Sequence, residues 1–204
     1  MKQTGKLTMT TGRALSAGLA TLCLALPAWV DCSKEDLTNE DNLCLYVVAG
    51  VNYSYLHPHS NGTSWRVTDE YGHGAEVAVG VHANEDWSVE ISYADLGSAG
   101  MQNLSPAVEG TYRIDYRVPA IWAQYRLMGD KMAQDWDLSV RAGVSFMINK
   151  SSDPVLPFKE QTTVQIPVGV SLQWWPEGDW GFRLKLDSYD YDVYSLSTSL
   201  MYGF

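Results

Sequence analysis

The chain lacks any long apolar run after its first 30 residues. A membrane-spanning helix needs about 20 consecutive apolar residues, so the sequence excludes helical spans beyond that point. Basic residues are also scarce, with 14 Lys and Arg against 24 Asp and Glu. Nucleic-acid binding depends on basic side chains that neutralise phosphates. The charge balance therefore argues against nucleic acid as a partner.

Cysteine is scarce as well, with three residues in the whole chain and no CxxC pair of the redox or zinc type. Cys32 and Cys44 flank a short polar segment. In an oxidising compartment we expect them to form a disulfide, and two free thiols are the alternative. No cofactor and no metal ion is predicted.

The N-terminus has the pattern of a secretory signal peptide. Lys2, Lys6 and Arg13 precede an apolar run, and small residues near Ala28 predict cleavage there. Removing three basic residues leaves 11 against 24 acidic ones, a mature net charge of 11 − 24 = −13. The predicted organisation is a signal peptide at 1–28, a periplasmic segment at 29–44 and one membrane domain at 45–204.

After Cys44 the chain divides into eight segments in which apolar and polar residues alternate. Each segment is close to the ~9–11 residues that a tilted strand needs to cross a membrane. The predicted strands are Leu45–Leu56, Gly74–Ala83, Trp87–Leu96, Tyr112–Leu127, Trp136–Asn149, Thr162–Trp175, Trp180–Ser188 and Asp192–Phe204. The fold class expected is all-β, an eight-stranded antiparallel up-and-down transmembrane β-barrel.

Loop lengths predict how the barrel is oriented. Long loops are expected at His57–His73, Gly97–Thr111 and Lys150–Gln161, and they alternate with short turns. Outer-membrane barrels have short turns on the periplasmic side and long loops outside. An even number of strands then predicts that both termini are periplasmic.

Tryptophans strengthen the membrane assignment because four of them flank the short turns, where an aromatic girdle is expected. They are Trp87, Trp136, Trp174 and Trp180.

The faces of the fourth predicted strand, Tyr112–Leu127, are ambiguous. Tyr112, Ile114, Tyr116 and Val118 favour one outward face, whereas Ile121, Ala123 and Tyr125 favour the other, as a bulge near Pro119 would explain.

The parity opposite to the lipid-facing residues carries charged side chains. Eight strands enclose a lumen only wide enough for side chains, so we predict that these charges pair and plug it. The predicted lumenal network is Glu76, Glu90, Arg113, Asp115, Arg117, Arg141, Arg183 and Lys185. The alternative is a narrow path for small solutes, opened when Glu90 exchanges its arginine partner.

The last strand carries apolar and aromatic residues on one face and ends on an aromatic. These residues are Tyr194, Leu196, Leu200, Tyr202 and Phe204. A last strand must pair with the first, since an open edge in hydrocarbon leaves backbone groups unsatisfied. The pattern resembles the signal that barrel-assembly machinery recognises.

Three segments carry a family resemblance: Glu90–Ala99, Asp137–Phe146 and Tyr189–Ser197. They resemble the transmembrane domain of outer membrane protein A and its small-barrel relatives. The resemblance implies a bacterial outer-membrane location among phospholipid and lipopolysaccharide. It also implies lumenal Glu–Arg and Glu–Lys pairs at Glu90, Arg141, Arg183 and Lys185. The peptidoglycan-binding domain of the namesake has no counterpart here, so cell-wall tethering is not implied.

The function expected is a structural or surface-interaction role carried by the outer loops, without catalysis. A lipid-modifying enzyme is a weaker alternative, for which His57, His59, Ser60 and Asp69 are the candidates. His57, His59 and His73 are also weighed as ligands for a metal ion, against the commoner outcome of solvated histidines.

Overall fold

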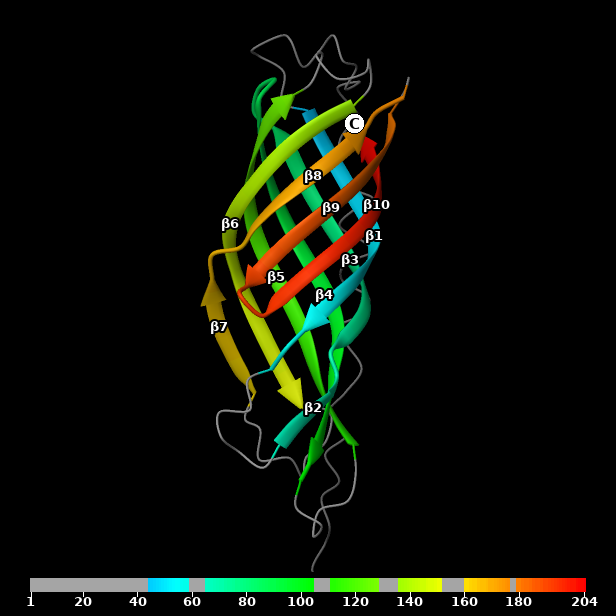
Figure 1. The fold of residues 1–204 in the computed structure, drawn as a ribbon. Helices are drawn as coiled ribbons and strands as arrows, with labels where there is room; N and C mark the ends of the chain where they lie inside the picture. The colour runs from blue at the N-terminus through cyan, green and yellow to red at the C-terminus, as the bar shows by residue number, and fades with distance from the viewer. Residues whose placement is uncertain (1–43, 59–64, 105–110, 129–135, 152–159, 177–178) are drawn as a thin grey trace, which may run out of the picture.

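A computed structural model describes the chain outside residues 1–43, 59–64, 105–110, 129–135, 152–159 and 177–178 (Figure 1). The described residues form the strands β1 (Cys44–Leu56), β2 (Trp65–Asp69), β3 (Tyr71–His82), β4 (Trp87–Asn103), β5 (Thr111–Met128), β6 (Trp136–Ser151), β7 (Gln161–Gln165), β8 (Val168–Trp174), β9 (Trp180–Asp190) and β10 (Val193–Gly203). Among these residues, no helix is long and apolar enough to cross a membrane.

The strands close into a barrel. The sheet runs in the order β2-β4-β3-β1-β10-β9-β8-β6-β5, and an additional pairing of β4 with β5 completes the circle. β7 and β8 follow each other along β6, interrupted at Ile166 and Pro167, so they count as one strand of the wall. β2 pairs with the far part of β4 outside this circle. The predicted eight-stranded antiparallel barrel is confirmed.

Both described ends of the barrel chain lie at one end of the wall. Tyr46, near the start of β1, pairs with Gly203 at the end of β10. The backbone N–H of Phe204 donates to the carbonyl of Leu45 at 2.9 Å. We call this the terminal end, and the opposite end, where β2 lies, the loop end (Figure 1).

Strands β3, β4 and β5 reach further toward the loop end than predicted. β4 continues to Asn103, through much of the expected loop Gly97–Thr111. A β-bulge explains why the sequence did not show this extension. The register of β4 with β5 shifts between Asp95 and Gly97. Gly97 has a φ of 83°, and its N–H donates to Asp95 Oδ1 at 2.9 Å. A bulge interrupts the alternation of faces, so the sequence reads there as a loop.

The polarity of the wall reverses near this bulge. Toward the terminal end, Ile91 faces outward and Glu90 inward. Toward the loop end, Leu96 and Ile114 are fully buried in an apolar core, while Arg117 is exposed. On β4 and β5 the inward residues of the loop half are therefore apolar, and the outward residues of β5 are polar, as in a water-soluble barrel.

This reversal corrects the assignment of β5. Arg113 and Arg117 are exposed and Asp115 is half-buried on the outer face, so the prediction that these three residues belong to the lumen is wrong. Ile114, Tyr116 and Val118 point inward instead. The pairing of β5 with β6 keeps one register across Pro119, so the bulge suggested there is absent. The same parity of β5 points inward from Ile114 to Gln124. Its inward residues lie in an apolar core at the loop end and in the polar lumen toward the terminal end.

Two aromatic girdles border the apolar outer wall. At the terminal end, neighbouring rings include Trp87 with Tyr125, Trp136 with Trp174, and Trp180 with Tyr202, with centroids 5.0, 6.0 and 4.8 Å apart. Toward the loop end, Tyr71 packs against Tyr53 and Tyr55 at 5.5 and 5.9 Å. Amphipathic rings at two levels fit the two interfaces of a membrane. The second girdle was not predicted.

We expect Gly97→Ala to lower the free energy of unfolding. A non-glycine residue in left-handed backbone geometry costs about 1–2 kcal/mol, and the added Cβ would lie 2.6 Å from the backbone nitrogen of His73. Urea unfolding of the vesicle-folded protein, followed by tryptophan fluorescence, measures the change. The neighbouring Ser98→Ala is the control and should shift stability by no more than about 0.5 kcal/mol. Equal stability of the two variants would contradict the role given to the bulge.

Candidate functional site: the lumenal charge network

Six charged side chains from four strands meet in the middle of the lumen. Three are acidic and three basic, so their formal charges cancel, 3 − 3 = 0. They are Glu76 on β3, Glu90 on β4, Arg141 on β6, and Arg183, Lys185 and Asp187 on β9. Each side chain is at most 3% exposed. They converge because inward positions on all strands of a narrow barrel share one small interior.

Glu90 is the most highly coordinated member. Its Oε2 lies 2.5 Å from Arg183 Nη1, and its Oε1 lies 3.4 Å from Arg141 Nη1. Tyr46 Oη and Gln124 Nε2 each donate to Oε2 at 3.2 Å. Two guanidinium groups and two neutral donors therefore stabilise a single buried carboxylate.

The remaining charges continue this chain of contacts. Arg141 Nε lies 3.3 Å from Asp187 Oδ1, and Asp187 Oδ2 lies 3.4 Å from Lys185 Nζ. Lys185 Nζ then lies 2.6 Å from Glu76 Oε2, and Ser199 donates to Glu76 Oε1 at 2.7 Å. The signs alternate at every step from Arg183 to Glu76. Buried charges are tolerated in such an arrangement because each one has an opposite neighbour.

Small residues make room for the network. Gly80 lies beneath the ring of Tyr46, and a Cβ there would lie 2.1 Å from Tyr46 Cζ. Gly169 lies beside Asp187, where a Cβ would be 2.2 Å from Oδ1. Both sites therefore require glycine if Tyr46 and Asp187 are to keep their positions.

Aromatic residues cover the network on its loop side. The guanidinium carbon of Arg141 lies 3.7 Å from the centroid of a Trp122 ring, a cation–π contact. Trp122 Nε1 donates to Ser92 at 3.0 Å, and its ring packs against Tyr189 with centroids 5.9 Å apart. The apolar core of the loop half begins here, so charge gives way to hydrocarbon inside the barrel.

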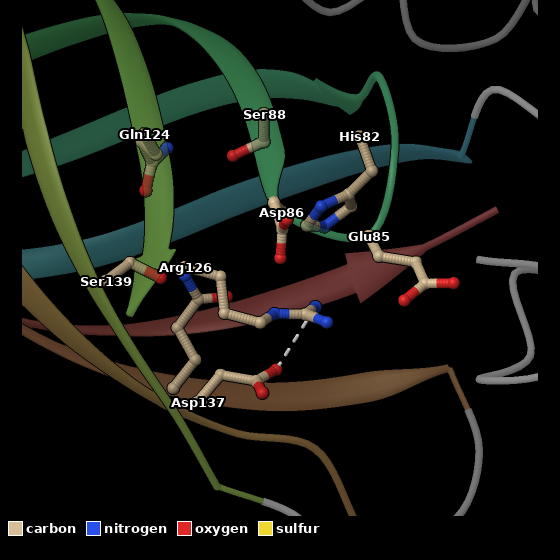
Figure 2. Close-up of a pocket in the computed structure, with 9 residues that line it drawn as sticks. His82, Glu85, Asp86, Ser88, Gln124, Arg126, Asp137 and Ser139 are labelled. Carbon is tan, nitrogen blue, oxygen red and sulfur yellow. Dashed lines mark ion pairs between the residues drawn. The ribbon is translucent and has the colours of Figure 1, made fainter. Parts of the chain in front are cut away.

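A small cavity lies on the terminal side of the network (Figure 2). Its lining includes His82, Asp86 and Arg126, and Arg126 Nη2 lies 3.4 Å from Asp137 Oδ2. Its volume is about 10 Å³, roughly the space of a single water molecule. The cavity is too small to serve as a conduit for solutes.

The structure places most of the predicted lumenal residues together. Glu76, Glu90, Arg141, Arg183 and Lys185 meet as described, and Arg113, Asp115 and Arg117 do not join them. Sequence reasoning missed the polar partners Tyr46 and Gln124 and the covering ring of Trp122. The inward parity of β1 would have indicated Tyr46, whereas the other two lie on the ambiguous strand β5.

The loop histidines have other neighbours. His57 Nδ1 lies 2.8 Å from Glu70 Oε1, and the ring of His73 packs edge-on against Tyr53 at 5.1 Å. Asp69 Oδ1 accepts a bond from the N–H of Tyr71 at 3.2 Å. His59 and Ser60 lie outside the described residues. Within the described part of the chain, no three His, Cys, Asp or Glu side chains are grouped as metal ligands.

The remaining predicted sites lie at the terminal end or on the last strand. Cys44 is disulfide-bonded, and its predicted partner Cys32 lies outside the described residues, as do residues 1–28. Tyr194, Leu196 and Leu200 are 41–48% exposed on the outer face of β10. The ring of Tyr202 packs against Phe204 at 4.9 Å. The predicted assembly signal therefore continues the apolar outer wall.

Comparison with known proteins identifies the fold. No family model and no curated protein sequence matches the chain. Solved structures do match, and they show that the chain has the fold of eight-stranded outer-membrane β-barrels.

Three of these structures illustrate the likeness. The outer membrane protein OprG of Pseudomonas aeruginosa matches with a TM-score of 0.59 and 12% identity, over 79% of this chain and 95% of that one. The N-terminal β-barrel domain of Pseudomonas aeruginosa OprF matches with a TM-score of 0.52 and 10% identity, over 78% and 97%. Ail, the attachment invasion locus protein of Yersinia pestis, in complex with the heparin analogue sucrose octasulfate, matches with 0.51 and 16%, over 79% and 99%. At these identities the likeness concerns the fold alone.

We expect Glu90→Gln to destabilise the barrel strongly, because it leaves two buried guanidinium groups without their shared carboxylate. Breaking a buried ion pair in this way costs about 3–5 kcal/mol. Urea unfolding of the vesicle-folded protein measures the loss. Asp115→Asn, which removes a carboxylate from the outer face, is the matched control and should change stability by no more than about 0.5 kcal/mol.

A double variant tests the pairing itself. Adding Arg183→Gln to Glu90→Gln should restore part of the lost stability, because the two residues contact each other and their effects are not additive. Additive effects, or a Glu90→Gln variant as stable as Asp115→Asn, would show that the network does not hold the lumen together.

Proposed function

We propose that the protein is a sealed outer-membrane barrel that acts through its loop end, in a structural or surface-interaction role. The reversal of polarity along the wall carries this proposal. The terminal half has an apolar exterior suited to hydrocarbon, and on β5 the loop half has a polar exterior over an apolar core. Such a loop half is a rigid extension of the sheet beyond the membrane.

The dimensions of the wall support this placement. Arg117 and Arg113 lie eight and twelve residues along β5 from Tyr125 in the terminal girdle. With a rise of about 3.3 Å per residue and a tilt near 40°, they stand about 20 and 30 Å above it. The apolar band of such barrels is about 25 Å tall. The outward arginines of β5 therefore lie on either side of the level at which such a band ends, Arg117 about 5 Å below it and Arg113 about 5 Å above it.

The proposal includes orientation, location and partners. The loop end faces the outside, and both termini are periplasmic. Phospholipid and lipopolysaccharide surround the wall, and barrel-assembly machinery recognises the face of β10 that ends in Phe204. No catalytic role is proposed.

A labelling experiment tests the orientation. Asp115→Cys should react with a membrane-impermeant maleimide on intact cells, because its side chain lies on the polar outer face of the loop half. Val140→Cys, on the apolar wall, should not react, and the unaltered chain corrects for native cysteines. Labelling of Asp115→Cys only after cell lysis would place the loop end in the periplasm and overturn the proposal.

A narrow channel is the second candidate function. It is favoured by the position of Glu90 between two arginines, because exchange of partners would reshape the lumen. Planar-bilayer recording of the folded protein distinguishes the two functions. A lumen filled by paired charges and an apolar core should give no openings. Discrete single-channel openings that change amplitude in Glu90→Gln would establish the channel instead.

A further inference from the structure

Within the described chain, the strand β7 has a neighbouring strand on one edge only (Figure 1). It pairs with β6 along its whole length. On the side away from β6, β8 pairs with β9 as far as Ser188, and β9 ends at Asp190. Continuing that register places Asp190 opposite Ile166, so β9 ends before it reaches β7. We call the side of β7 away from β6 its open edge, where alternate backbone N–H and C=O groups face outward from the sheet.

The open edge of β7 lacks the features that usually prevent a strand from pairing with another chain. Such edges are commonly protected by charged residues or proline. β7 contains neither, and its three central residues, Thr162, Thr163 and Val164, are β-branched and exposed. By contrast β2, which pairs only with β4 among the described strands, carries Arg66 and Asp69. β7 is therefore the less protected of the two edge strands.

The position of β7 makes this edge accessible from water. Thr162 and Arg117 both lie opposite Ile148, on the two sides of β6. β7 is therefore near the level of Arg117, about 5 Å below the border of the apolar band. At that level a chain on the water side of the membrane can lie alongside β7.

Carboxylates border the open edge at both ends. At one end, Gln165 Nε2 donates to Asp190 Oδ2 at 2.9 Å. At the other, Glu160 is exposed directly before the strand. Lys150 lies between Glu160 and Asp115 by register, so the carboxylates outnumber it. The surroundings of the edge are acidic, and they favour a basic partner.

Geometry excludes a symmetric pair of β7 strands from two copies in one membrane. Two antiparallel copies of a strand are related by a two-fold axis perpendicular to the sheet. In a barrel wall this axis lies in the plane of the membrane, so it would turn the second barrel upside down. For a parallel pair the axis follows the strand, which is tilted about 40° from the membrane normal, and the second barrel would not stand upright.

We propose that β7 binds an extended segment of a second protein, which adds a strand to the open edge and carries basic residues on both sides of an uncharged centre. Hydrogen bonds between main chains give the affinity in this mode of binding. The carboxylates of Glu160 and Asp190 select the charge of the partner. This inference rests on the proposed surface-interaction role and names the class of partner for it.

Peptide binding to the full detergent-folded protein tests the proposal. The probe is a synthetic peptide of alternating threonine and valine with lysine at both ends, and fluorescence anisotropy should show saturable binding. The same peptide with N-methyl groups along one edge should bind at least about tenfold more weakly, because main-chain hydrogen bonds are lost. A peptide with glutamate in place of lysine should bind several-fold more weakly than the lysine peptide. No saturable binding, or equal binding of the N-methylated peptide, would overturn the proposal.

Hydrogen exchange locates the bound peptide. Alternate amides of β7 should exchange rapidly in the protein alone and become protected when the lysine peptide is added, while the exchange of β2 stays unchanged. Slow exchange of every β7 amide in the protein alone would show that another segment of the chain already covers the edge. That result, or protection of β2 instead of β7, would contradict the proposed site.

Charge variants test the selection of a basic partner. Glu160→Gln/Asp190→Asn should weaken binding of the lysine peptide several-fold. Glu85→Gln/Asp86→Asn removes two exposed carboxylates at the terminal end and is the matched control, which should bind as the wild type does. Equal losses in the two variants would show a general attraction to an acidic protein and overturn the proposal.

Native mass spectrometry of the folded protein should show a monomer when no peptide is present. Oligomers that the peptide disperses would assign the open edge to a second copy of this chain and contradict the proposed partner. None of these measurements depends on orientation in cells, so a failure here is distinct from a failure of the labelling experiment.

Discussion

A sheet that crosses hydrocarbon has to close on itself, because water is absent there to satisfy an open edge. In this protein the pairing of β1 with β10 and of β4 with β5 completes that closure. Closure with eight strands leaves an interior that side chains fill. Polar side chains that point inward are then buried together, and charged ones must find partners. The alternating contacts from Arg183 through Glu90 to Glu76 meet this requirement.

The bulge at Gly97 marks the level at which the surroundings of the barrel change. On the terminal side of it, hydrocarbon lies outside and charge inside. On the loop side, the same strands bury Leu96 and Ile114 and expose Arg117. Apolar residues thus face outward in the terminal half, and on β4 and β5 they face inward in the loop half. A sealed barrel whose loop half extends beyond the membrane is the arrangement we propose, with its function at the surface of that half rather than in the lumen.

The eight strands could be predicted from sequence because alternation is strong in the membrane half, where one face meets lipid. The lumenal pairs of Glu90 followed from parity for the same reason. The faces of the loop half could not be predicted, because the prediction placed apolar residues outside, toward lipid. In the loop half of β5 the apolar residues point inward and the charged ones outward. The prediction that Arg113 and Arg117 are lumenal assumed that charged residues face the lumen, which holds only for the part of a strand that lies against lipid. The partners of Glu90 on β1 and β5 depend on how far each side chain reaches across the lumen, which periodicity does not encode.

We infer that polarity reverses along β5 at the membrane border. Paramagnetic relaxation in the NMR spectrum of nanodisc-embedded protein tests this most directly, residue by residue along β5. A water-soluble paramagnet should broaden the amides of Arg113, Asp115 and Arg117, and a spin label on lipid chains should broaden those of Ile121, Ala123 and Tyr125. Broadening of the Arg113–Arg117 amides by the lipid label alone would place these charges within the hydrocarbon and contradict the account.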